Sequence, residues 1–287
     1  MEHPFFTGVC TALVTPFWNG QVNYPMLEQL LRRQIEAGIR AVVLCGTTGE
    51  SATLSDGEKL EILGRAKACV GDACKIIAGT GSNDTEHAVV LSRAAEKVGA
   101  DGLLVVTPYY NKATPSGLLA HYSAVCHAVH IPVIAYNVPS RTGVDIPVAC
   151  YPALAAIPNL AGVKEASPDI AKIAKIAASC PGFPIWSGND DQAVAVMALG
   201  GQGVISVVSN LFPGKTQAMA AAALDGDFDT ASALQLEMLP LIEALFCEVN
   251  PIPVKAAMAI LGYDCGPCRL PLTPMGEENL QRLRKCL

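Results

Sequence analysis

The chain has 287 residues, of which 51% are hydrophobic and 16% charged, and its formal net charge is −6. Disorder requires low hydrophobicity and high charge, so this composition excludes a disordered chain. The mild acidity, without a block of lysines or arginines, argues against nucleic acid as a partner. The length suits either two ordinary domains or one large α/β domain.

The sequence carries no pattern typical of export or of membrane insertion. No basic segment followed by a long apolar run stands at the start, and the apolar runs are far shorter than a membrane-spanning helix. The eleven cysteines are scattered and odd in number. In a long chain without an export signal they predict reduced thiols and a cytoplasmic location.

Short, continuously apolar runs recur along most of the chain. Such runs are typical of parallel strands that are buried on both faces of a sheet. The predicted strands are 8–14, 41–45, 75–79, 102–107, 132–137, 160–164, 184–187 and 203–206.

Helix signals lie between these runs. Ser55 and Glu58 have the spacing of a capping box. Asn83 or Asp84 can cap the next helix, and Pro168 suits the first turn of a later one.

The repeated alternation of strand and helix predicts a (β/α)8 TIM barrel over residues 1–225. A doubly wound open sheet is the alternative, but the first run is not followed by a G-x-G-x-x-G turn. From residue 226 to 287 the pattern changes to helices alone, predicted at 227–247, 251–261 and 276–286. We expect this segment to form a C-terminal helical extension packed on the barrel.

Lys164 closes the sixth apolar run, where the active sites of such barrels lie. Burial disfavours the charged ammonium and frees a neutral amine, which can attack a carbonyl group. The alternative is a structural ion pair with Glu165 or another neighbour. Adjacent strand residues point to opposite faces, which makes the pair with Glu165 awkward. Lys164 is therefore a candidate for Schiff-base chemistry.

A Schiff-base enzyme also needs groups that move protons and hold a carboxylate. The hydroxyl groups of Thr47, Tyr110 and Tyr136 follow or end predicted strands and can relay protons. Each of them could equally be a hydrogen-bonded wall residue. Arg141 has the planar fork that suits a carboxylate, with loop stabilisation as the alternative. The histidines make no recognisable zinc pattern, so no metal site is predicted.

The Cys265-Gly266-Pro267-Cys268 segment has the spacing of a thioredoxin-type redox motif. That motif depends on a helix N-terminus that lowers the pKa of the first thiol. Pro271 and Pro274 follow here and preclude a continuous helix. We predict a turn that holds two cysteines, with a redox role as the lesser alternative.

Four motifs occur in order along the chain. They are Gly46-Thr47-Thr48-Gly49-Glu50, Tyr136-Asn137-Val138-Pro139-Ser140-Arg141-Thr142-Gly143, Gly162-Val163-Lys164-Glu165 and Asn250-Pro251-Ile252-Pro253-Val254-Lys255. Together they resemble the dihydrodipicolinate synthase family, within the pyruvate-dependent class I aldolases that include N-acetylneuraminate lyase. The resemblance runs nearly end to end. It implies a homotetramer built as a pair of dimers, and no cofactor, since the lysine itself serves as electron sink.

The resemblance also implies a reaction and the residues that perform it. Lys164 matches the lysine that forms a Schiff base with pyruvate, and Tyr136 matches the tyrosine that moves protons there. Thr47 and Tyr110 match its relay partners, with Tyr110 supplied across a dimer interface. The enamine of pyruvate would attack aspartate semialdehyde, and cyclisation would release a heterocyclic precursor of lysine.

Three further positions match substrate contacts. Thr48 and Ile205 match residues that contact pyruvate, Thr48 at its carboxylate. Arg141 matches the arginine that receives the carboxyl group of the semialdehyde, and lyases acting on sialic acid usually lack it. The alternative is another pyruvate aldolase, such as one for a 2-keto-3-deoxy sugar acid or for N-acetylneuraminate. A non-enzymatic barrel would require the loss of Lys164 or Tyr136, and both are present.

Family members that lysine inhibits have an allosteric pocket at the dimer interface. The resemblance places this pocket near Ser51, Lys59, Asn83, His87 and Tyr109. Inhibited members tend to carry a histidine and a glutamate where this chain has Lys59 and His87. A glutamate attracts the ammonium groups of lysine, whereas Lys59 would repel them. We therefore predict weak or absent inhibition by lysine.

Overall fold

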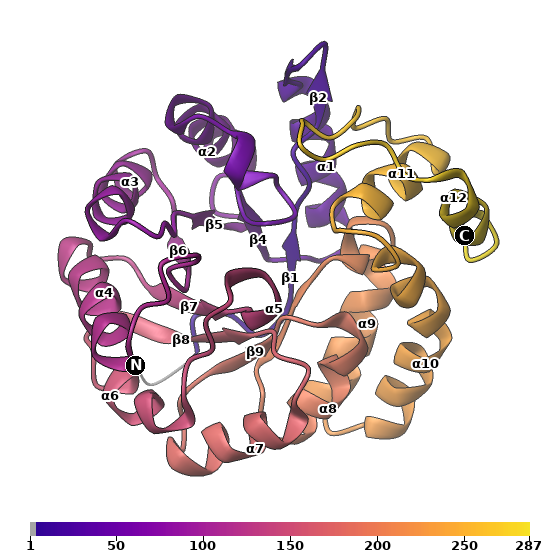
Figure 1. Cartoon of the computed structure of the whole chain (residues 1–287). Coiled ribbons are helices and arrows are strands. Elements are labelled where there is room, and N and C mark those ends of the chain that lie inside the picture. The colour runs from indigo at the N-terminus through magenta and orange to yellow at the C-terminus, as the bar shows by residue number, and fades with distance from the viewer. Residues whose placement is uncertain (1–3) are drawn as a thin grey trace.

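A closed barrel of parallel strands forms the centre of the molecule (Figure 1). The computed structural model describes residues 4–287, and residues 1–3, at the start of the predicted barrel segment, lie outside the described part. Within the described residues the barrel strands are β1 (Gly8–Ala12), β4 (Ala41–Leu44), β5 (Lys75–Gly79), β6 (Gly102–Val106), β7 (Val133–Asn137), β8 (Leu160–Glu165), β9 (Ile185–Ser187) and β10 (Gly203–Ser206). β1 pairs with both β4 and β10, which closes the ring. The predicted TIM barrel is confirmed.

Helices follow the strands and surround them (Figure 1). They are α1 (Tyr24–Glu36), α2 (Asp56–Val70), α3 (Thr85–Lys97), α4 (Pro115–Ala128), α6 (Tyr151–Ala155), α7 (Ile170–Ser179), α8 (Ala193–Ala198) and α9 (Pro213–Leu224). A short helix, α5 (Pro139–Thr142), lies in the loop after β7. The predicted capping box is confirmed at α2, where Ser55 accepts from the N–H of Glu58 and the Glu58 carboxylate accepts from the N–H of Ser55.

Two local details differ from the sequence prediction. Pro168 was expected in the first turn of a helix, and this is wrong. Asp169 caps α7 by accepting a hydrogen bond from the N–H of Lys172 at 3.1 Å, so Pro168 precedes the helix. The second difference is a small antiparallel hairpin, β2 (Phe17–Trp18) and β3 (Gln21–Val22), which turns at Asn19 and Gly20.

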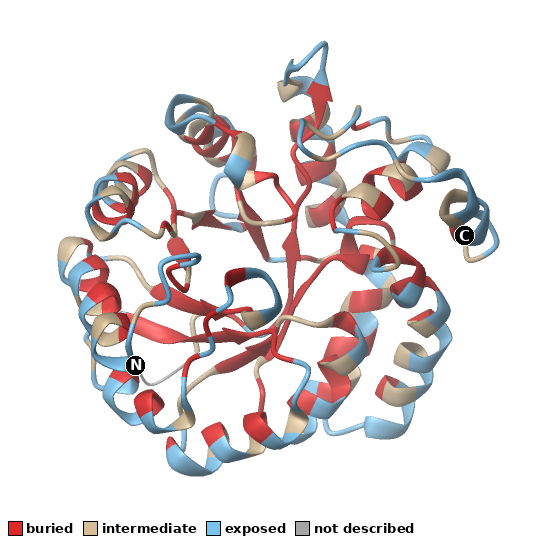
Figure 2. Ribbon diagram, viewed as in Figure 1, coloured by how far each residue is buried: buried red, intermediate tan, exposed pale blue. Residues whose placement is uncertain are grey.

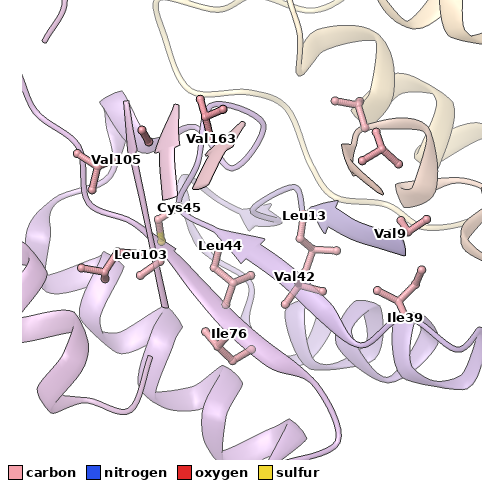
Figure 3. Close-up of a cluster of buried hydrophobic side chains, with 14 of the residues drawn as sticks. Val9, Leu13, Ile39, Val42, Leu44, Cys45, Ile76, Leu103, Val105 and Val163 are labelled. Carbon is pink, nitrogen blue, oxygen red and sulfur yellow. The ribbon is translucent and has the colours of Figure 1, made fainter. Parts of the chain in front are cut away.

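The strands are buried on both faces, which explains their continuously apolar sequences (Figure 2). Along β4, Val42 and Leu44 join the apolar layer beneath the helices, together with Ile76 of β5 (Figure 3). Ala41 and Val43 point the other way and belong to the cluster inside the barrel. Alternate residues of every strand therefore serve two different cores.

The amino-terminal end of the barrel is filled by aromatic side chains. The ring of Trp186, on β9, stacks on Phe6 with centroids 4.7 Å apart, and its indole N–H donates to the carbonyl oxygen of Phe6 at 3.2 Å. The interior at this end is packed and contains no open pore. Space for a substrate is therefore expected at the carboxyl end of the strands.

The chain after the barrel forms α10 (Phe228–Leu245), α11 (Ile252–Ile260) and α12 (Glu277–Arg284). A buried ion pair joins this segment to the loop after β4: Lys255 Nζ lies 2.6 Å from Glu50 Oε1. The second carboxylate oxygen of Glu50 accepts from the backbone N–H of Arg269 at 2.8 Å. Both side chains of the ion pair are almost fully buried. Within residues 4–287, every helix is too short or too polar to cross a membrane.

Replacing Lys255 by methionine should leave the Glu50 carboxylate buried without its cation. We expect the free energy of unfolding, measured by urea titration, to fall by about 3–5 kcal/mol. The double variant E50Q/K255M removes both charges, so it should be more stable than K255M alone. Equal losses in the two variants would contradict the assigned role of the ion pair.

Candidate active site

The carboxyl ends of β7 and β8 bring Tyr136 and Lys164 together. The two residues are paired in register, and Lys164 Nζ lies 4.3 Å from the centre of the Tyr136 ring. Each is 6% exposed. Among the described residues, Lys164 forms no salt bridge, and Glu165 instead faces Lys172 at 3.7 Å. The alternative of an ion pair between Lys164 and Glu165 is therefore wrong.

The absence of a side chain at Gly188 lets the backbone pack closely against the Lys164 side chain. A Cβ atom at Gly188, just after β9, would lie 3.1 Å from Lys164 Cε and 2.5 Å from Ala166 Cβ. A larger residue at position 188 would therefore crowd the methylene group next to Lys164 Nζ. No role for Gly188 was predicted from the sequence.

Asn250 lies in the segment before α11 and connects Thr48 with Arg141, two residues that are predicted to contact substrates. Its side-chain amide donates to Thr48 Oγ1 at 3.0 Å, and its backbone carbonyl oxygen accepts from Arg141 Nη2 at 3.3 Å. Thr48 and Asn250 are buried, whereas Arg141 is exposed. Asn250 was given no individual role from the sequence, although it opens one of the motifs that carry the family resemblance.

Thr47 and Ile205 lie on other strand ends of the same barrel face. Thr47 follows β4, where its carbonyl oxygen accepts from the N–H of Glu50 at 3.1 Å. Ile205 belongs to β10 and to the apolar cluster inside the barrel that also contains Tyr136. The turn after β10 is held by Asp190, whose Oδ2 accepts from two successive backbone N–H groups at 2.9 and 3.0 Å. Burial raises the pKa of the Asp190 carboxyl group.

Tyr110 stands apart from the other predicted proton-relay residues of its own chain. Its side chain is 88% exposed, and its backbone has a φ of 73°, in the left-handed region. The backbone N–H of Tyr110 donates to the carbonyl oxygen of Thr142 at 3.3 Å, which ties the loop to the segment after β7. One chain alone therefore brings Tyr136 and Lys164 together without the Tyr110 ring.

The predicted regulatory positions on α2 and α3 are joined by an acidic side chain. Asp56 Oδ2 lies 2.8 Å from His87 Nε2, and Asp56 Oδ1 lies 3.6 Å from Lys59 Nζ. The hydrogen bond with His87 lowers the pKa of the Asp56 carboxyl group. The two departures from the family pattern thus share one exposed carboxylate.

The remaining regulatory positions lie near this group of side chains. Ser51 lies in the short helical turn before α2, and Asn83 immediately precedes Asp84, the capping residue of α3. Asn111 Nδ2 donates to the carbonyl oxygen of Asn83 at 2.9 Å. This bond connects the start of α3 to the loop that carries Tyr109, whose side chain is exposed.

The Cys265–Cys268 segment is irregular, the assigned turn lies at residues 270–271 instead of at the two cysteines, and the next helix begins only at Glu277. Both cysteines are free thiols. Burial raises the pKa of Cys265 to about 12 and that of Cys268 to about 11. A redox-active thiol requires the opposite shift, so the surroundings oppose a thioredoxin-like role.

The described residues 4–287 contain no cluster of metal ligands, and two of their cavities lie away from Lys164. No group of three or more histidine, cysteine or acidic side chains within residues 4–287 could hold a metal ion. A cavity of about 490 Å³ lies at the opposite end of the barrel, lined by residues that include Leu160, Pro184 and Gln202. Another, of about 420 Å³, lies between the β2–β3 hairpin and α11. Neither is lined by a predicted site residue.

Known proteins resemble this chain over its whole length. The model of the dihydrodipicolinate synthetase family matches residues 5–287. The 4-hydroxy-tetrahydrodipicolinate synthase of Acetivibrio thermocellus is 47% identical, over 100% of this chain and 98% of its own. The chain therefore belongs to the dihydrodipicolinate synthetase family.

Two solved structures are similarly close. The chloride-inhibited dihydrodipicolinate synthase of Acinetobacter baumannii, complexed with pyruvate, has a TM-score of 0.96 and 41% identity, covering 98% of this chain and 97% of that one. The enzyme of Cyanidioschyzon merolae with lysine bound has a TM-score of 0.95 and 39% identity, covering 99% and 98%.

Iodoacetamide should modify Cys265 and Cys268 slowly in the folded protein at neutral pH, because only the thiolate reacts. The labelling rate of Cys268, followed by peptide mass spectrometry, should rise with pH toward its pKa of about 11. Protein unfolded in urea is the control and should react as an ordinary thiol does. Rapid labelling of the folded protein at pH 7 would contradict the effect of burial.

Proposed function

We propose that this protein is a 4-hydroxy-tetrahydrodipicolinate synthase that condenses pyruvate with L-aspartate 4-semialdehyde in diaminopimelate and lysine biosynthesis. One observation carries the proposal: a buried lysine amine without a carboxylate partner among the described residues lies beside a tyrosine at the carboxyl end of a barrel. Family membership and the names of the full-length relatives support the same reaction.

We propose that the reaction uses protein side chains without a cofactor. The Lys164 amine adds to the ketone of pyruvate, and water leaves to form the imine. Loss of a methyl proton gives the enamine, whose carbon attacks the aldehyde. The amino group of the second substrate then attacks the imine carbon, which closes the ring and returns the Lys164 amine. Tyr136 moves the protons, with Thr47 and Tyr110 as relay partners.

Substrate carboxylates would be held at two depths. Thr48 and Ile205 are proposed to contact pyruvate, Thr48 at its carboxylate. Arg141 is exposed at the mouth of the barrel, and the bond to Asn250 orients its guanidinium group. A planar guanidinium that retains free donors suits the carboxylate of the semialdehyde. This arginine favours the synthase over an aldolase for N-acetylneuraminate or for another sugar acid.

We propose that the protein works as a homotetramer, a pair of dimers. The exposed ring of Tyr110 supports this assembly, because a neighbouring subunit would receive it beside Tyr136. The eleven cysteines, all within the described residues, are free thiols. Free thiols are expected in a reducing compartment, and we propose a cytoplasmic location.

Borohydride reduction in the presence of pyruvate should trap a pyruvyl adduct on Lys164, located by peptide mass spectrometry. The variant K164M should form no adduct and lose the condensation activity with aspartate semialdehyde. The exposed lysine at the start of β5 provides a control, since K75M should form the adduct normally. Folded wild-type protein without an adduct would overturn the proposed mechanism. An adduct together with activity only on a sugar aldehyde would favour the alternative aldolase.

Lysine at millimolar concentration should leave the rate unchanged within about twofold, because Lys59 repels the ammonium groups of the ligand. The double variant K59H/H87E restores the residues typical of inhibited members and should gain sensitivity. Initial rates measured with and without lysine test both proteins. Strong inhibition of the wild type would show that Asp56 neutralises Lys59 well enough to admit the ligand.

A further inference from the structure

A buried polar network lies on the outer face of β7 and β8, directly behind Tyr136 and Lys164. Asn137 and Glu165 follow these two residues in their strands and are themselves paired in register. Neighbouring strand residues face opposite sides. Tyr136 and Lys164 therefore face the barrel interior, whereas Asn137 and Glu165 face the surrounding helices. The side chain of Glu165 is fully buried.

The Glu165 carboxylate is surrounded by donors. The side-chain amide of Asn137 lies 2.9 and 3.1 Å from its two oxygens, and the N–H of Ser167 donates to Oε1 at 2.8 Å. The Tyr151 hydroxyl donates to Oε2 at 2.7 Å, and Lys172 Nζ lies 3.7 Å from the same oxygen. A carboxylate at this depth depends on such partners, since an unpaired buried charge is strongly unfavourable.

The same network holds the loop that carries Arg141. Asp145, in this loop, accepts from Asn137 Nδ2 at 2.8 Å and forms an ion pair with Lys172. The Asn137 carbonyl oxygen Oδ1 accepts from the N–H of Ile146 at 3.0 Å. The loop is thus attached to the two strands at its middle, before it continues into α6.

The ladder between β7 and β8 contains one irregularity. Below the site the pairing shifts between Val133 and Ile134: Val133 pairs with Leu160, but Ile134 pairs with Gly162. A shift of one residue moves every side chain of a strand to the opposite face. The bonds between Asn137 and Glu165 lie at the other end of this ladder, next to the pair of Tyr136 and Lys164.

We propose that Asn137, Asp145, Tyr151, Glu165 and Lys172 form a positioning network for the reaction. They set the separation of Tyr136 and Lys164 and the place of the Arg141 loop, without touching substrate themselves. The inference rests on the proposed function, because it concerns how the residues of that reaction are held. A misplacement of about 1 Å can cost about a hundredfold in rate.

Tyr151→Phe is the sharpest test, because it removes one donor to Glu165 and keeps the ring that packs edge-on against Phe183 at 6.3 Å. We expect kcat, and the rate at which pyruvate is trapped on Lys164 by borohydride, to fall at least about tenfold. The KM for pyruvate should change much less.

Two variants of Lys172 give a second test. K172R keeps the charge and should retain more activity than K172M. If K172M does not fold, Y151F carries the test.

Thr11→Val supplies the matched control. Thr11 donates to Gln34 Oε1 at 2.7 Å and is fully buried, on a strand that pairs with neither β7 nor β8. T11V should lower the thermal midpoint as Y151F does while keeping the trapping rate within about twofold of wild type, since its strand carries no reacting group. A fall in the Y151F rate no larger than that of T11V would overturn the inference. Absence of any adduct in the wild type would instead overturn the proposed function, and the inference with it.

Discussion

The alternation of side chains in a closed parallel barrel is the constraint on which this molecule depends. Each strand has one row of residues inside the barrel and one row beneath the helices. At the ends of β7 and β8 the inner row supplies Tyr136 and Lys164, and the outer row supplies Asn137 and Glu165. Tyr136 and Asn137 are therefore consecutive in sequence, as are Lys164 and Glu165, but the members of each pair lie on opposite faces of the same two strands.

The separation of the two rows gives neighbouring charged side chains different surroundings. Glu165 is directed away from the interior and is satisfied by Tyr151, Asn137 and Lys172. Lys164 lies beside Tyr136, and Gly188 packs closely against its side chain. The same strand thus carries a buried carboxylate and a buried amine in neighbouring positions.

The C-terminal segment completes the catalytic end of the barrel. Lys255 and the backbone of Arg269 satisfy the Glu50 carboxylate, which follows the Thr47-Thr48-Gly49 turn after β4. Asn250 joins that turn to Arg141. The helical extension therefore positions loops that come from two distant parts of the barrel, and its removal would leave a charged side chain buried without a partner.

Local sequence determined the strands, most helix starts and the class of the fold. The apolar runs are continuous because both faces of each strand are buried, and Ser55 forms its capping box with residues only three positions away. The β2–β3 hairpin was missed because its strands are only two residues long, although Asn19-Gly20 is a typical hairpin turn. Lys164 was identified from its place at a strand end, and the family motifs indicated the remaining site positions.

Only the tertiary structure decided that Glu165 accepts a hydrogen bond from Tyr151 and that Lys59 and His87 share Asp56. It also decided that the Tyr110 side chain is exposed and does not pack against its own chain. The physical reason is distance along the chain: periodicity and caps act over a few residues, whereas a buried charge takes its partner from whichever segment the closed barrel brings beside it.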